Sequence, residues 1–147
     1  MPIKIDVTKI GGKIVNEHDE PEKRMAEYDF SAVLRNVGEK TLYDAAVTIN
    51  CNRKIQVKDT DRDLVIERTD ANAVTFRPIR MMHPNDKERR ISWTATAKPF
   101  PYINGIDATR IVVTFRVCAR DRQPEELAVE FDGDEPSSTT KEATRQT

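Results

Sequence analysis

Residues 28–51 read YDFSAVLRNVGEKTLYDAAVTINC, and this stretch decides the fold class. Apolar side chains fall at every second position on both sides of a turn: Tyr28, Phe30, Ala32 and Leu34 before it, and Val47, Ile49 and Cys51 after it. The turn between them, NVGEK at 36–40, is polar and contains glycine. Alternation of this kind around a glycine turn is typical of strands that bury one face in an antiparallel sheet.

The same alternation recurs along the chain and predicts further strands. Gly11 and Gly12 should break the first strand, and Trp93 should lie between two sheets because it alternates in phase with Ile91 and Ala95. Turn signals separate the strands every ~8–12 residues, the spacing of a β-sandwich. We therefore predict that residues 1–131 form an all-β, immunoglobulin-like antiparallel β-sandwich of about seven to nine strands. The expected strands are 3–10 with a resumption at 13–15 after the glycines, 25–36, 43–51, 55–58, 64–67, 74–76, 90–97, 110–118 and 127–131.

The C-terminal residues 132–147, DGDEPSSTTKEATRQT, contain no apolar side chain except Ala143. A segment that brings so little apolar area cannot offset the entropy lost on ordering. We expect a flexible polar tail that adds nothing to the stability of the sandwich and is available to hold a partner.

Composition places the chain among single-domain globular proteins without a strong electrostatic bias. It has 147 residues, 37% of them apolar and 33% charged, and a net charge of −1. Such a charge does not steer a protein toward nucleic acid or anionic lipid. No run of ~18 apolar residues predicts a transmembrane helix, and the N-terminus lacks the apolar stretch of a secretory signal. The expected location is the cytoplasm, with a virion as the alternative.

The two cysteines, Cys51 and Cys118, end two strands that should be antiparallel neighbours. Their sulfur atoms would then lie at opposite ends of the sheet, on the order of 20 Å apart. A disulfide needs Cα atoms within roughly 7 Å. We expect two reduced thiols.

The pattern resembles the immunoglobulin-like domains of the cell-adhesion-related (CARDB) type found in bacteria and archaea. The residues that carry the resemblance are Asn36-Val37-Gly38 with the strand at 42–49, and the proline-containing turn at 83–86 before Ile91-Ser92-Trp93. It covers residues 25–131, and departs from the family at Asp44-Ala45 and in a longer segment 53–80. The resemblance implies a binding or spacing module with no catalytic residues.

Four aspartates, Asp59, Asp61, Asp63 and Asp70, stand at the spacing of an EF-hand calcium loop. Leu64 occupies the position where that loop needs glycine, and the flanking residues alternate as strands do. A solvated loop between two strands is the alternative to a calcium site. We expect no bound metal.

Motifs of catalysis are not recognisable in this sequence. The histidines, His18 and His83, lie in charged loops without the spacing of zinc ligands. No nucleophile motif, phosphate-binding loop or dinucleotide fingerprint is present. We expect a protein that is not an enzyme and holds no cofactor.

The most basic stretch lies between residues 77 and 90, where acidic residues interrupt it. Loop arginines on immunoglobulin-like folds can hold phosphates; ordinary surface charge balanced by acids is the alternative. The residues of this candidate patch are Arg77, Arg80, Lys87, Arg89 and Arg90, with His83 among them and further arginines at Arg110, Arg116, Arg120 and Arg122.

Loop 98–108, KPFPYINGIDA, carries Phe100, Tyr102 and Ile103 together with two prolines. Aromatic side chains on a stiff loop bind a partner with little loss of side-chain entropy. They could instead plug the open end of the sandwich.

These observations favour a non-catalytic protein-interaction or assembly module that binds a protein partner or itself through loop 98–108, its edge strands or its tail. One alternative is a phage or virus structural protein, such as a decoration or tail-associated subunit. Another is a nucleic-acid-associated module that uses residues 77–90.

Overall fold

The computed structural model describes residues 3–14, 25–97, 110–133, 135–136 and 138–145. Their regular structure is entirely β-strand, which confirms the all-β prediction. No helix in these ranges is long and apolar enough to cross a membrane. The described part of the chain forms eleven strands: β1 (Ile3–Ile14), β2 (Ala26–Asn36), β3 (Ala46–Cys51), β4 (Lys54–Thr60), β5 (Leu64–Thr69), β6 (Ala73–Pro78), β7 (Arg89–Ala97), β8 (Ile111–Cys118), β9 (Glu125–Phe131), β10 (Thr139–Glu142) and β11 (Thr144–Arg145).

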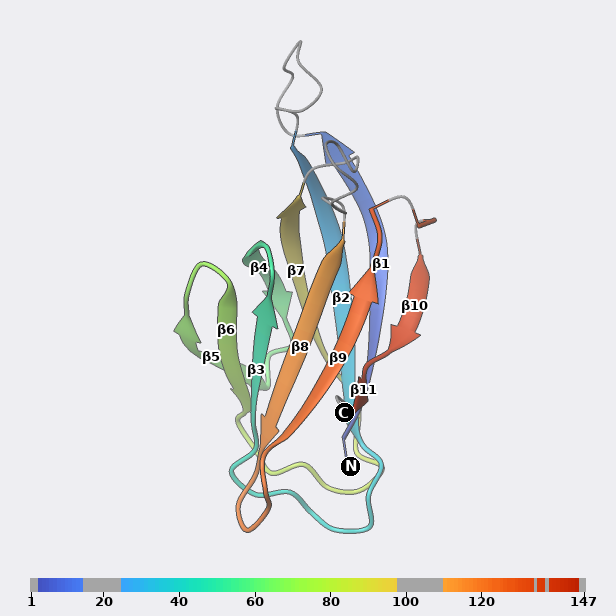
Figure 1. Cartoon of the computed structure of the whole chain (residues 1–147). Coiled ribbons are helices and arrows are strands. Elements are labelled where there is room, and N and C mark those ends of the chain that lie inside the picture. The colour runs from blue at the N-terminus through green and yellow to red at the C-terminus, as the bar shows by residue number, and fades with distance from the viewer. Residues whose placement is uncertain (1–2, 15–24, 98–109, 134, 137, 146–147) are drawn as a thin grey trace.

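The strands build two antiparallel sheets that pack face to face (Figure 1). The first sheet has five strands in the order β10-β1-β2-β7-β4, and the second has six in the order β11-β9-β8-β3-β6-β5. In the first, β1, β2, β7 and β4 correspond to the A, B, E and D strands of an immunoglobulin sandwich; in the second, β3, β8 and β9 correspond to C, F and G. The predicted antiparallel β-sandwich is confirmed, but its eleven described strands exceed the predicted seven to nine, because residues 139–145 add β10 and β11.

The stretch at 28–51 connects the two sheets and is not a pair of neighbouring strands. β2 pairs with β1 and β7, whereas β3 pairs with β6 and β8. Connection 37–45 crosses between the sheets, with Leu42 bridged to Met82 and Asp44 in a left-handed conformation at φ 52°. Alternation shows which side chains face the core, but it does not identify the strand's partner.

The glycine pair near the N-terminus bends β1 without ending it, contrary to the predicted break. The register with β2 shifts between Lys9 and Gly11, which marks a β-bulge. The Tyr28 ring lies so close to Gly12 that a Cβ atom there would be 2.6 Å from a ring carbon. Glycine is required at this position because the aromatic ring packs directly against the backbone.

An aromatic cluster joins the two sheets at the centre of the core. Trp93 on β7 stacks on Phe30 of β2 with 5.8 Å between ring centroids, and it meets Phe115 of β8 edge-on at 6.3 Å. Phe30 in turn contacts Phe131 of β9 at 5.3 Å. Trp93 is fully buried, as predicted. Aromatic pairs in these geometries contribute beyond their buried area.

The C-terminal segment is a strap over one edge of the sandwich, so the prediction of a flexible tail is wrong for residues 139–145. β10 pairs with β1 of the first sheet, and β11 pairs with β9 of the second. Ala143 lies between them, is only 4% exposed, and its N–H donates to the Ile5 carbonyl at 2.9 Å. The strap is held mainly by backbone hydrogen bonds, which composition does not reveal.

A buried lysine fixes the turn that leads into the strap. Lys9 on β1 is 2% exposed, and its Nζ donates to the carbonyl oxygens of Asp132 at 3.2 Å, Gly133 at 2.8 Å and Glu135 at 2.6 Å. Three carbonyl acceptors satisfy an ammonium group that burial would otherwise penalise. The ordered domain therefore extends beyond the predicted boundary at residue 131.

The register of β3 and β8 confirms that these strands are antiparallel neighbours. Cys51 faces Val113 and Cys118 faces Ala46, so the cysteines lie at opposite ends of the ladder. Both thiols are free. Burial raises the pKa of the Cys51 thiol, although the N–H and positive charge of Arg53 oppose the shift.

We expect Cys51 to react slowly with iodoacetamide in the folded protein, because alkylation needs a thiolate and access. Its raised pKa favours the neutral thiol in the native state, so the thiol's contribution to the free energy of unfolding is fully present below the pKa that the thiol has in the unfolded chain. That contribution is lost as pH rises through the higher pKa of the thiol in the folded protein. Peptide mapping after brief labelling at pH 8 should find Cys118 modified first, and both residues modified in denaturant. Equal native labelling rates would show that Cys51 is accessible.

Candidate interaction surfaces

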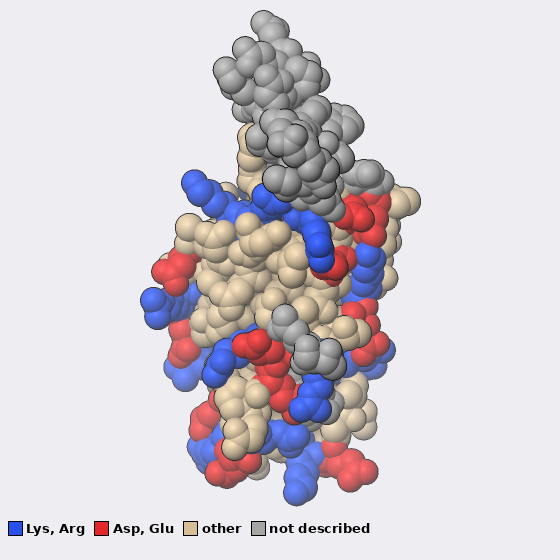
Figure 2. Space-filling model, in the orientation of Figure 1, with Lys and Arg blue, Asp and Glu red and all other residues tan. Residues whose placement is uncertain are grey.

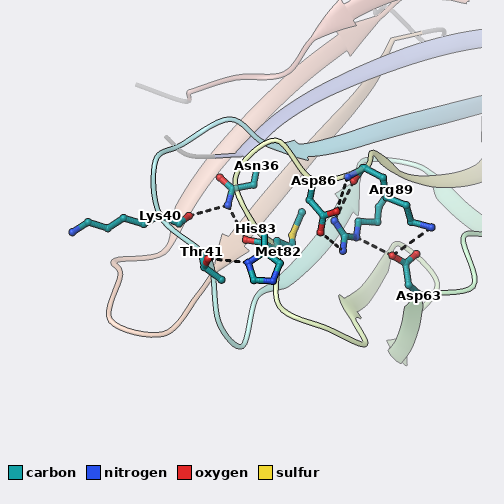
Figure 3. Close-up of polar contacts among 9 residues, drawn as sticks. Asn36, Lys40, Thr41, Asp63, Met82, His83, Asp86 and Arg89 are labelled. Carbon is teal, nitrogen blue, oxygen red and sulfur yellow. Dashed lines mark hydrogen bonds and ion pairs between the residues drawn. The ribbon is translucent and has the colours of Figure 1, made fainter.

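Connections 37–45, 79–88 and 119–124 meet at the lower end of the sandwich in Figure 1. Asn36, 1% exposed, ties the first two together: its Nδ2 donates to the carbonyls of Lys40 at 2.9 Å and Met82 at 2.8 Å (Figure 3). Its Oδ1 accepts the Gly38 N–H at 2.9 Å. The third connection joins through Arg120, whose N–H donates to the Tyr43 carbonyl at 2.9 Å. The hydrogen bonds fix the relative positions of these loops.

A buried arginine organises the neighbouring part of this end. Arg89 is 4% exposed; its Nε donates to Asp63 Oδ2 at 3.0 Å and its Nη2 to Asp86 Oδ2 at 3.3 Å (Figure 3). Its Nη1 donates to the Lys87 carbonyl at 3.1 Å. The pKa of Asp86 is lowered, first by the hydrogen bond from the Lys87 N–H and then by the charge of Arg89. Arg89 thus holds two loops together and is not available to a ligand.

Replacing Arg89 by leucine should lower the free energy of unfolding by about 1–3 kcal/mol, because Asp63 and Asp86 would lose their shared donor. The exposed neighbour Arg90 provides the matched control, and Arg90→Leu should change stability by less than about 0.5 kcal/mol. Urea unfolding followed by circular dichroism measures both. Equal effects would show that the Arg89 pairs do not stabilise the loops.

A groove with a volume of about 830 Å³ opens beside this cluster. It lies between Arg62 and Asp63, which precede β5, and the connection 79–88 with Arg89, the first residue of β7. The side chains that line it include cations, two carboxylates and two exposed apolar groups: Arg62, Asp63, Ile79, Arg80, Met81, His83, Asp86, Lys87 and Arg89. It combines positive charge with apolar surface.

The five residues of the predicted basic patch do not form one surface. Arg80, Lys87 and Arg89 line the groove, with Arg89 buried in ion pairs. Arg77 on β6 is paired with Glu67 at 2.8 Å, and exposed Arg90 lies outside the groove lining. The arginines near β8 also have acidic partners: Arg110 pairs with Glu130, Arg116 with Glu126 at 3.7 Å, and Arg120 with Asp44 at 2.6 Å.

The four aspartates of the calcium hypothesis point to separate partners. Asp59 accepts the Thr60 N–H at 2.9 Å and Asp61 accepts the Arg90 N–H at 2.7 Å. Asp63 bonds Arg89, and Asp70 pairs with Arg68 at 3.2 Å. No group of three or more metal-ligating His, Cys, Asp or Glu side chains occurs among the described residues.

Two other predicted features, the interface loop and the two histidines, lie wholly or partly outside the described residues. Phe100, Tyr102 and Ile103 of the proposed interface loop lie outside the described residues, as does His18. His83 lies in the groove lining, and its Nδ1 shares a hydrogen bond of 3.1 Å with Thr41 Oγ1. This bond is another contact between connections 37–45 and 79–88 (Figure 3).

The outer face of the six-stranded sheet carries an uncharged area that the sequence interpretation missed. Figure 2 shows it as a broad region without charged side chains at the middle of this face. Thr48 lies opposite Thr75, Asn50 opposite Thr114, and Thr114 opposite Ala128. We call this area the threonine face: Thr48, Asn50, Ala73, Thr75, Val112, Thr114 and Ala128.

Charged side chains surround the threonine face and are paired with one another. Glu67–Arg77, Arg116–Glu126 and Arg110–Glu130 are ion pairs at its margins. Within the face, the hydroxyl groups of Thr48 and Thr75 share a hydrogen bond of 2.9 Å. The outward positions of the alternating pattern were available in the sequence, but only the strand order shows that they form one area.

Comparisons with known proteins identify no family for this chain. No protein-family model matches it, and no curated protein matches it. Among solved structures it is similar to a GH20 exo-β-N-acetylglucosaminidase from Vibrio harveyi in complex with N-acetylglucosamine, with 14% identity and a TM-score of 0.41 over 90% of this chain. An inactive mutant of that enzyme gives a TM-score of 0.43, and the chain spans only 18% of the enzyme's length.

A FixG-related protein from Vibrio parahaemolyticus is also similar, with 12% identity and a TM-score of 0.34 over 90% of this chain and 96% of that one. TM-scores and identities this low carry no argument about function, and none of these proteins supplies one here.

Proposed function

We propose that this chain is a non-catalytic protein-interaction or assembly module that binds its partner through the threonine face. The observation that supports the proposal is that seven uncharged, outward-facing positions adjoin one another across four strands, in a chain whose residues are 33% charged. The centres of protein interfaces are depleted of charged residues, while their rims stay polar.

The chemistry of the face suits close contact with another protein. Threonine, alanine and valine side chains are short, so a second protein surface can approach these strands closely. Removing such groups from water costs much less than removing charges. The threonine hydroxyls and the Asn50 amide can donate and accept hydrogen bonds across the interface.

Assembly into a larger structure, such as a phage or virus particle, is a second candidate favoured by the strap. β10 and β11 contact two sheets mainly through backbone pairing, and they bury one apolar side chain, Ala143. Exchange of such an element between identical subunits is an energetically cheap route to assembly. The location would be the virion for this candidate and the cytoplasm for the first.

Nucleic-acid binding receives less support than either. The predicted basic segment has Arg77 and Arg89 already paired with acids, and acidic residues 86 and 88 lie within it. A phosphate backbone is bound by a continuous set of free cations.

Analytical ultracentrifugation over a range of concentrations tests the assembly role. We expect self-association that Thr48→Arg or Thr114→Arg abolishes, because each places a charge in the interface. Thr96→Arg is the matched control, since Thr96 faces outward on the opposite sheet. A monomer at every concentration would limit the proposal to a different protein partner, and association unaffected by the face variants would contradict it.

A further inference from the structure

We propose that the groove beside Arg89 binds an acidic, extended peptide segment of a protein partner. This second binding site is separate from the threonine face, and it is independent of the function proposed above. The inference rests on the charge of the groove and on its exposed apolar side chains.

The charge of the groove is unbalanced. Four cationic side chains line it against two carboxylates: Arg62, Arg80, Lys87 and Arg89 against Asp63 and Asp86. Both carboxylates are already bonded to the buried Arg89. Arg62 and Arg80 form no ion pair within the described residues, and Lys87 reaches Asp63 only at 4.0 Å. Three cations at the surface are therefore open to an acidic ligand, and carboxylates bind arginine in a bidentate geometry.

Apolar side chains lie among these cations. Ile79 is 61% exposed and Met81 is 44% exposed, on either side of Arg80. Exposed apolar groups of this size flanking an arginine fit a peptide in which apolar and acidic residues alternate. Methionine adapts its shape to different apolar partners.

The walls are fixed before binding. Arg89 joins Asp63 to Asp86, and the Ile79 N–H donates to the Asp63 carbonyl at 2.7 Å. Preformed walls reduce the entropy lost when a ligand binds. A nucleic acid fits less well, because the free cations are few and clustered around apolar groups rather than spread along a track.

The test is fluorescence anisotropy with labelled peptides and the full chain. The probe is Gly-Glu-Val-Glu-Leu-Glu-Gly, with a lysine-for-glutamate version and a serine-for-apolar version as controls. We expect saturable, salt-sensitive binding of the probe, about tenfold weaker binding of the serine version, and none of the lysine version. Arg62→Glu and Arg80→Glu should each weaken binding about tenfold or more.

Two further variants separate this site from other surfaces. Lys54→Glu reverses an exposed charge on β4 outside the groove and should leave affinity unchanged within about twofold. Thr114→Arg, which tests the threonine face, should also leave peptide binding unchanged. Circular dichroism spectra of the groove variants should match the parent, because Arg62 and Arg80 are exposed.

Four results would overturn the proposal. The probe could fail to bind, or bind equally to the groove variants. Oligothymidylate of matched charge could bind more tightly and depend on Arg80, which would indicate nucleic acid. A peptide of the chain's own acidic residues 15–22 could bind more tightly than the probe, which would make a second copy the occupant.

Discussion

Trp93→Ala should lower the free energy of unfolding by about 3–5 kcal/mol, the usual cost of truncating a buried aromatic residue. Trp93 is fully buried and contacts Phe30 in its own sheet and Phe115 in the facing one. Its removal leaves a cavity at the point where the sheets meet. Chemical denaturation followed by circular dichroism measures the change, since the chain has only this one tryptophan.

Trp93→Phe separates packing from hydrogen bonding. The Trp93 Nε1 is buried without a hydrogen-bond partner among the described residues, so the indole N–H contributes a cost rather than a bond. Phenylalanine keeps most of the ring contacts and removes the cost of the unpaired indole N–H. Trp93→Phe should therefore lower the free energy of unfolding much less than Trp93→Ala. A Trp93→Ala effect below about 1 kcal/mol would contradict the buried position of this residue.

Ending the chain after residue 138 should lower the free energy of unfolding by about 2–4 kcal/mol, through lost strand pairing on both sheets and loss of the buried Ala143. For a chain of this size that corresponds to a fall in melting temperature of roughly 5–15 °C. Ala143→Asp should cost about the same, because the strap detaches rather than bury a carboxylate. Thermal unfolding followed by circular dichroism measures both.

Thr140→Ala provides the control for the strap. Thr140 is exposed and shares one hydroxyl contact with Thr8, so its loss should cost less than about 0.5 kcal/mol. An unchanged melting temperature after truncation would show that residues 139–145 do not stabilise the sandwich, as their composition alone suggests.

The sequence predicts well what depends on alternation. Ile91, Trp93 and Ala95 are all buried, and β3 and β8 are antiparallel neighbours as expected. It predicts poorly which strands pair with one another. The crossing between β2 and β3, the bulge at Gly11 and the strap at Ala143 arise from long-range backbone pairing, for which local residue types carry little information.

For the candidate site, too, the sequence predicts which residues cluster but not which distant residues they pair with. The basic residues at 80 and 87 reach a common groove as their clustering suggested, but Arg89 is buried and Arg77 is paired. Charge along the chain does not reveal which arginine has an acidic partner from a distant strand. The threonine face combines β3, β6, β8 and β9, so it appears only once the strand order is known.

Site-specific photo-crosslinking in cells of the source organism tests the central claim most directly. A photoreactive residue at position 114, in the middle of the threonine face, should crosslink to one defined protein or to a second copy of the chain. The same residue at position 96, on the opposite sheet, should not. Mass spectrometry identifies the partner, and Thr48→Arg should abolish the adduct. Crosslinking from position 96, from loop 98–108 or from the strap, with none from position 114, would contradict the account.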